Sequence, residues 1–255
     1  MTIERTDADA GAARTFYGIK AIVAADKRPE KKGGFIMAKE YLIAGATGLV
    51  GSELVTQLLA SADTGNIWLL GRRAVDSADQ RIKNISYDFQ GEPKFAAKPK
   101  SPVAFCTLGT TIKQAGSQEA FRRVDYDFVL RFAEVAKTLG ATSLHVVTAH
   151  GAAKNSMIFY NRVKGEIEET LSHVGLPALH IYRPSLLIGD RKEHRAGEGF
   201  ATAAAKVMSP LFKLPGLSSV QPTPARHLAA FMLQTAAQSV PGYHIHSNAE
   251  IMAGT

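Results

Sequence analysis

Short apolar runs and amphipathic stretches alternate along the chain from Glu40 onwards. Apolar runs of four to eight residues bounded by turn residues predict strands, whereas apolar residues spaced by three and four predict helices. The pattern predicts strands at 41–44, 67–70, 82–88, 103–106, 144–147 and from 179, and helices after the glycines at 45–51, at 118–139 and at 156–173. Such an alternation is typical of βαβ units. The sequence therefore predicts an α/β fold of Rossmann type, with a doubly wound parallel sheet.

The two ends of the chain lack this alternation. Residues 1–36 carry seven basic and five acidic side chains without a signal-peptide apolar run, and we expect a disordered extension there. Five acids are also many for a transit peptide. From about Asp190 the pattern gives way to scattered Gly and Pro, so residues 190–255 are predicted to form a small irregular cap on the substrate side of a single domain spanning 37–255.

Composition narrows the classes of function. The 255 residues carry a net charge of +7, but the basic residues are scattered, which argues against nucleic acid and favours a phosphate-bearing cofactor. The single cysteine, Cys106, excludes an intrachain disulfide framework and fits a reducing compartment, so a cytoplasmic location is expected. No apolar run reaches the roughly 20 residues that span a membrane. His244 and His246 alternate on a predicted strand without a nearby carboxylate or cysteine, and no metal site is predicted.

A glycine-rich turn joins the first predicted strand to the first helix. Gly45 allows a tight turn, Gly48 allows the backbone to approach a pyrophosphate, and Gly51 allows close packing of helix on strand. The N-terminus of the helix then offers free N–H groups and the positive end of its dipole to phosphates. The predicted contacts of the turn with a dinucleotide come from Gly45, Thr47, Gly48, Leu49, Val50 and Gly51. A turn with glycines for packing alone is the less favoured interpretation.

The end of the second predicted strand bears on which dinucleotide is bound. An acidic residue there would bind a ribose 2′-hydroxyl, whereas an arginine accommodates a 2′-phosphate. The chain reads Gly71-Arg72-Arg73, so NADP(H) is favoured over NAD(H). Arg72 is the first candidate and Arg73 the second, because adjacent side chains face different ways.

A tyrosine and a lysine lie four residues apart just after the fifth predicted strand. This spacing places Tyr160 and Lys164 on one face of a helix, about one turn apart. A tyrosine with the ordinary pKa of ~10 exchanges protons poorly at neutral pH, and a nearby cation lowers that pKa. The pair thus indicates acid–base chemistry.

Together with Asp88 and the segment 108–111, these features make the chain resemble the short-chain dehydrogenase/reductase superfamily. Residues 107–137, 151–171 and 182–198 are similar to its atypical branch of Tat-interacting oxidoreductase-like proteins. The resemblance implies that Tyr160 is the general acid and base and that Lys164 holds the nicotinamide ribose and lowers the pKa of Tyr160. It further implies cofactor contacts from Asp88, Leu108, Gly109, Thr110, Arg183, Pro184 and Leu186.

One element of that superfamily is altered in this chain. A serine usually ends the fifth strand and binds the substrate carbonyl, but here the chain reads Thr148-Ala149. Thr148 is the predicted substitute if its side chain points into the site. If the serine position corresponds to Ala149, the partner is missing or comes from Ser156 or His150.

The sequence therefore predicts an NADPH-dependent oxidoreductase that acts on a small carbonyl or alcohol. The alternative is a non-catalytic NADPH-binding redox sensor or scaffold with a protein partner. The chain contains no G-x-S-x-G serine elbow and no G-x-x-x-x-G-K-[ST] phosphate loop, which argues against a serine hydrolase and an ATPase. Related folds often pair, so a homodimer is compatible with the sequence.

Overall fold

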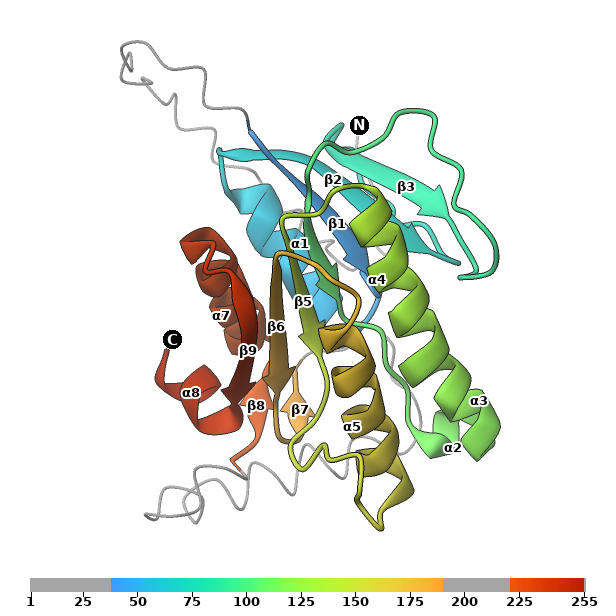
Figure 1. The fold of residues 1–255 in the computed structure, drawn as a ribbon. Coiled ribbons are helices and arrows are strands. Elements are labelled where there is room, and N and C mark those ends of the chain that lie inside the picture. The colour runs from blue at the N-terminus through green and yellow to red at the C-terminus, as the bar shows by residue number, and fades with distance from the viewer. Residues whose placement is uncertain (1–37, 190–220, 255) are drawn as a thin grey trace, which may run out of the picture. The chain divides into compact units, whose positions relative to one another are not determined.

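The computed structural model describes residues 38–189 and 221–254, and these contain a seven-stranded sheet (Figure 1). The strand order is β3-β2-β1-β4-β5-β6-β9, and every neighbouring pair is parallel. The strands are β1 (Lys39–Ala44), β2 (Thr64–Gly71), β3 (Ile82–Ser86), β4 (Val103–Cys106), β5 (Ser143–Val147), β6 (Ala178–Arg183) and β9 (Gly242–Ser247). The predicted Rossmann-type parallel sheet is confirmed. The third strand ends at Ser86, two residues earlier than predicted.

Helices cover both faces of the sheet. They are α1 (Leu49–Ala60), α2 (Ile112–Ala115), α3 (Gln118–Arg122), the π-helix η1 (Arg123–Asp127), α4 (Phe128–Thr138), α5 (Phe159–Ser172), α7 (Ala225–Gln238) and α8 (Asn248–Ala253). One buried apolar cluster joins α1 and α7 to the sheet, and the other joins α4 and α5 to it. Two short strands, β7 (Leu187–Ile188) and β8 (Thr223–Pro224), pair separately.

The predicted helix at 118–139 is present, but a π-turn interrupts its α-helical geometry. Phe121, Asp125 and Val129 are buried and spaced by four residues, which exceeds the 3.6 residues of an α-helical turn. The wider π-turn keeps all three on the side that faces the sheet. An apolar periodicity alone does not reveal this turn, because one of the three buried residues is an aspartate.

The described C-terminal residues extend the main domain. Helix α7 packs on the sheet beside α1, and β9 pairs with β6 as the seventh strand. This part of the chain therefore differs from the irregular cap predicted over 190–255. The sequence predicts a strand around His244 and His246, but β9 is an edge strand with few apolar residues, and these do not indicate that it joins the main sheet. Residues 190–220, where the rest of that predicted cap falls, and the predicted extension at 1–36 lie outside the described residues.

A row of rings crosses the sheet on the side of α7. Neighbouring strands contribute Tyr41, Phe105, His145, His180 and His244, with ring centroids 4.7 to 6.2 Å apart. His145 and His180 are buried.

None of the helices in 38–189 and 221–254 is both long enough and apolar enough to cross a membrane.

Candidate active site

The glycine turn closes on itself at the carboxyl end of β1. Gly45 has φ +86°, and the N–H of Gly48 donates to the Gly45 carbonyl at 2.9 Å. A Cβ on Gly45 would lie 2.7 Å from Thr107, and one on Gly51 would lie 2.2 Å from the Gly45 carbonyl oxygen. A side chain at either position would collide with backbone, so the turn requires glycine at both.

The turn leads directly into α1. Gly48 is the N-cap residue and supplies no side-chain acceptor for the first N–H groups of the helix. Leu49 is partly buried, and Val50 packs in the apolar cluster between α1 and the sheet, so the Val50 side chain faces the core. The backbone of the turn and the positive end of α1 thus form the surface that fits a pyrophosphate.

Two arginines follow β2 beside this turn. Both are exposed, and Arg73 donates from Nη2 to the Thr47 hydroxyl at 3.2 Å. The contact ties Arg73, the second candidate from the sequence, to the glycine turn. Asp88 is exposed after β3, where its carboxylate accepts from the N–H of Gln90 at 2.9 Å.

Tyr160 and Lys164 lie in the first two turns of α5. Tyr160 is partly exposed, and its ring packs against the buried Phe121 with centroids 5.3 Å apart. Lys164 is buried, and its Nζ lies 2.8 Å from Oδ1 of Asp125 in the π-turn. The predicted spacing is therefore realised, but the lysine has an ion-pair partner that the sequence did not reveal.

The segment after β4 covers this ion pair. The N–H of Thr110 donates to Oδ2 of Asp125 at 2.9 Å. A Cβ on Gly109 would lie 3.5 Å from Oδ1 of Asp125 and 3.9 Å from Nζ of Lys164. Leu108 is partly buried and packs against the cluster beneath α4 and α5. The structure thus brings the predicted residues 108–110 together with Lys164.

Burial and charge act on Lys164 in opposite directions. Burial alone would lower the pKa of Lys164, but the negative charge of Asp125, with a smaller contribution from Tyr160, outweighs it and raises that pKa. The nearby Cys106 thiol is fully buried, and this raises its pKa to about 12. The thiol is therefore neutral near pH 7, as expected for a cysteine that packs as a small apolar residue.

The Thr148 hydroxyl is engaged away from Tyr160. It donates to Oε1 of Glu168 at 2.6 Å, and Glu168 lies two turns farther along α5, about 12 Å along the helix axis from Tyr160. The N–H of Thr148 donates to the Tyr182 carbonyl at 2.8 Å, so the pairing with β6 continues one residue past the end of β5. The Thr148 hydroxyl therefore belongs to a buried network, and its contact with a substrate carbonyl stays a prediction.

Arg183 completes that network. Its Nε donates to Oε1 of Glu168 at 3.1 Å, and the two side chains form an ion pair. The guanidinium predicted to lie near the nicotinamide therefore binds a buried carboxylate. After it, the Pro184 carbonyl accepts from the N–H of His150 at 2.8 Å, and Leu186 is 51% exposed.

The predicted residues gather at one edge of the sheet. The glycine turn follows β1, residues 108–110 follow β4, Tyr160 and Lys164 follow β5, and Arg183–Leu186 end or follow β6. The strand order reverses between β1 and β4 (Figure 1). Ligands of doubly wound folds bind outside the carboxyl ends of the strands at such a switch point.

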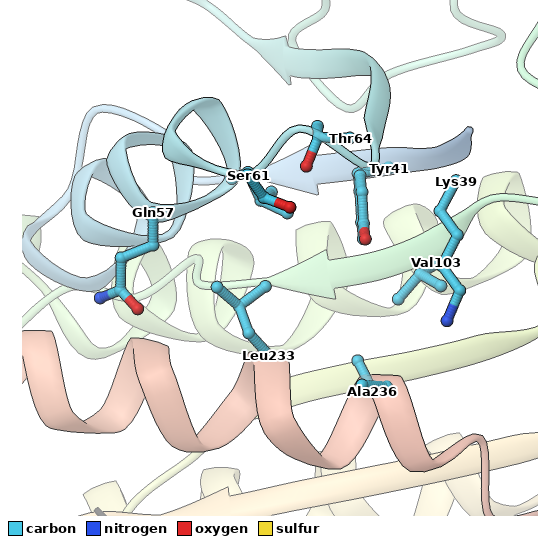
Figure 2. A pocket seen from close by; sticks show the side chains of 10 residues that line it. Lys39, Tyr41, Gln57, Ser61, Thr64, Val103, Leu233 and Ala236 are labelled. Atoms are coloured by element: carbon cyan, nitrogen blue, oxygen red, sulfur yellow. The ribbon is translucent and has the colours of Figure 1, made fainter. Parts of the chain in front are cut away.

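The described residues also enclose two hollows. A cavity of about 190 Å³ opens between the ends of α1 and α7 at the amino ends of the strands, with Lys39, Tyr41 and Gln57 among its lining residues (Figure 2). A second, of about 290 Å³, is lined by Glu168, Arg183 and Tyr243. No group of three or more potential metal ligands occurs within 38–189 and 221–254.

Comparison with known proteins gives relatives but no matching family model. The chain is 35% identical to protein HTATIP2 of Rattus norvegicus over 167 residues, which are 64% of this chain and 69% of that protein. It is 32% identical to the mitochondrial protein FMP52 of Candida glabrata, over 62% of this chain and 68% of that protein. The mitochondrial protein FMP52 of Lodderomyces elongisporus is 30% identical over 81% of this chain and 90% of its own length.

Solved structures share the fold at much lower identity. The Bordetella bronchiseptica enzyme WbmF in complex with NAD+ superposes with a TM-score of 0.61 at 14% identity, over 86% of this chain and 77% of its own. MoeE5 in complex with UDP-glucose and NAD gives a TM-score of 0.59 at 15% identity, over 84% and 80%. These likenesses establish the fold.

The relatives overturn the expected location. Several FMP52 proteins are named mitochondrial, which contradicts the cytoplasmic location predicted from the sequence. The argument failed because a single buried thiol indicates a reducing environment without specifying a compartment. The extent and identity of the matched regions show that the chain belongs to the family of the HTATIP2 and FMP52 proteins.

Proposed function

We propose that this protein binds NADP(H) across the carboxyl edge of the sheet and transfers a hydride between the nicotinamide and a small carbonyl or alcohol. The observation that carries the proposal is the position of Lys164. Its ammonium lies beneath Gly109, beside the strand-order switch point and one helical turn from Tyr160. That arrangement puts a cation and a proton donor next to a turn built for phosphates.

The glycine turn is the proposed pyrophosphate site. The space that side chains at Gly45 and Gly51 would occupy is filled by backbone, and the N-terminus of α1 has no side-chain cap. Arg72 and Arg73 follow β2 without an adjacent acid, which supports a cofactor with a 2′-phosphate. The contact between Arg73 and Thr47 brings one of these cations to the turn.

In the reducing direction, the bound nicotinamide would supply the hydride that adds to the carbonyl carbon. The Tyr160 hydroxyl gives its proton to the carbonyl oxygen, and the product is an alcohol. In the reverse direction the tyrosinate removes the proton of the alcohol. Lys164 holds the nicotinamide ribose and offers positive charge to the Tyr160 oxygen. Because Thr148 is bonded to Glu168, we assign the second contact to the carbonyl to the loop after β5, where Ser156 and His150 are the candidates.

Turnover and binding distinguish this proposal from its alternative. Purified protein is mixed with NADPH and a panel of aldehydes and ketones, cofactor consumption is followed by absorbance at 340 nm, and binding is followed by NADPH fluorescence. Replacing Tyr160 with Phe should lower turnover by roughly a hundredfold or more and leave binding nearly unchanged. The matched control is Tyr126→Phe, since the Tyr126 hydroxyl bonds to Thr170 at 2.8 Å in the interface between helices. Unchanged turnover of every substrate by the Tyr160 variant would refute the proposed mechanism.

The alternative is an NADPH-binding sensor or scaffold that does not consume the cofactor. The engagement of the Thr148 hydroxyl by Glu168 favours it, because the usual hydroxyl partner of the carbonyl is then occupied. Saturable NADPH binding without consumption across the whole panel supports the sensor.

A further inference from the structure

A buried ion pair joins two parts of the candidate site that are distant in the sequence. The side chains of Asp125 and Lys164 are 1% and 4% exposed, with Oδ1 and Nζ 2.8 Å apart. Neither the glycine turn nor the spacing of Tyr160 and Lys164 identifies Asp125 as part of the site. Its carboxylate is nevertheless held at a defined place, because Oδ2 accepts from the N–H of Thr110.

The backbone around Asp125 is specialised for this contact. Residues 123–127 form a π-turn inside an otherwise α-helical stretch. A π-turn disrupts regular helical hydrogen bonding, and such turns occur frequently at functional sites. Here the turn holds Asp125 on the buried side, in line with Phe121 before it and Val129 after it. The helix thus adopts an unfavourable geometry that delivers one carboxylate to Lys164.

We propose that Asp125 is a positioning residue, whose carboxylate keeps the buried Lys164 ammonium protonated and fixed beneath Gly109, where the cofactor ribose would be held. The inference rests on the proposed function for the role of that ammonium. Asp125 itself is buried beneath residues 109–110, so it acts through Lys164 and not on the substrate.

Of the titratable groups around Lys164, Asp125 is the one that keeps its ammonium protonated. Within the described residues, Tyr160 from α5 and Cys106 from β4 are the other titratable groups that influence the Lys164 charge. The Cys106 thiol is neutral near pH 7 because burial raises its pKa to about 12. The Tyr160 hydroxyl must carry its proton in order to donate it. An ammonium that is fully buried without an anion loses its proton readily, because a low-dielectric environment disfavours the charged form.

The test uses the isosteric variant Asp125→Asn in the full chain. The introduced amide keeps an acceptor for the Thr110 N–H but removes the charge. The ratio of the variant's NADPH dissociation constant to that of the wild type is measured by fluorescence from pH 6.5 to 9. We expect this ratio to rise at least tenfold across the range, as Lys164 loses its proton. Asp127→Asn is the matched control, because Asp127 is exposed in the same π-turn, and its ratio should stay flat.

A second measurement needs no cofactor. Thermal unfolding of Asp125→Asn is compared from pH 6.5 to 9 with that of the double variant Asp125→Asn/Lys164→Met. An unpaired Lys164 has a lower pKa in the folded than in the unfolded state, so the melting temperature of the single variant should rise with pH relative to the double variant. The wild type should not show this rise relative to the same double variant, because its Asp125 and Lys164 stay paired.

The two measurements separate the outcomes. A wild-type protein that fails to bind NADPH refutes the proposed function, while the unfolding curves still decide whether Asp125 keeps Lys164 charged. If the binding ratio and the relative melting temperature of Asp125→Asn are both independent of pH, the proposal for Asp125 is overturned. A pH-independent loss of affinity in Asp125→Asn also contradicts it, since this would be a structural effect alone.

Discussion

At low pH, protonation of the buried histidines in the row of rings under α7 should destabilise this protein. His145 and His180 stack with centroids 4.7 Å apart, and both are buried. Burial lowers the pKa of His180 from 6.5 to about 4, and burial, with repulsion from His180 and His246, lowers the pKa of His145 well below its usual value. Because the unfolded chain binds these protons at a higher pH than the folded chain, stability is full above pH 6.5 and falls as the pH decreases towards 4.

The size of the effect follows from the two pKa values of His180. At pH 5, protonation of His180 alone raises the equilibrium constant of unfolding by a factor of about 30. This lowers the free energy of unfolding by about 2 kcal/mol. His145 adds a contribution of the same sign. Replacing His180 with Gln removes the His180 contribution and leaves the carboxylates of the protein unchanged.

Urea unfolding at pH 7.5 and at pH 5.0 measures the difference. The wild type should lose about 2 kcal/mol more than His180→Gln between the two conditions. His173→Gln, which removes an exposed ring after α5, is the matched control and should lose as much as the wild type. Equal losses in the wild type and in His180→Gln would show that the buried rings do not couple folding to pH.

Three further predictions concern packing, reactivity and cofactor choice. Gly165→Ala should lower the free energy of unfolding by about 3 kcal/mol, because the new Cβ would lie 2.2 Å from the backbone of Ala153, whereas Gly71→Ala meets nothing closer than 3.9 Å and should be nearly neutral. Cys106 should resist a thiol reagent at pH 8 in the folded protein and react quickly in urea, since burial raises its pKa to about 12. Arg72→Ala should weaken NADPH roughly tenfold more than NADH, as measured by fluorescence titration.

Each of these has a clear contrary result. Equal melting temperatures of the two glycine variants would mean that the loop beside α5 yields freely. Rapid labelling of native Cys106 would mean that β4 opens to solvent. Equal losses of NADPH and NADH affinity in the arginine variant would remove the basis for preferring a 2′-phosphate.

The sequence predicted the features that depend on local pattern. The strands follow from short apolar runs, the glycine turn from its three glycines, and the Tyr160–Lys164 pair from its spacing of four residues, all within short windows. The sheet, and the edge at which the candidate site residues gather, could therefore be predicted without knowing any long-range contact. The strand that contains His244 and His246 is predicted as well, but the polar and aromatic residues of β9 do not indicate that it pairs with β6.

The remaining features depend on contacts between distant residues. The burial of Asp125 is stabilised by Lys164, 39 positions later, and nothing in the residues around Asp125 marks it as buried. The direction of the Thr148 side chain depends likewise on Glu168 and Arg183. An aspartate at the apolar spacing from Phe121, ahead of Y-x-x-x-K, is the signal that would have drawn attention to the pair.

The strand order also governs when the candidate site can form. The parallel neighbours β1 and β4 are separated along the chain by α1, β2 and β3, so the edge of β1 stays without its second partner until residue 106 has been added. The glycine turn comes early, whereas Lys164 and its helix come more than 100 residues later. Folding that depends on such distant contacts is slow compared with local helix formation. During synthesis the glycine turn is thus present long before Lys164, and the candidate site can be complete only after β1 and β4 have paired.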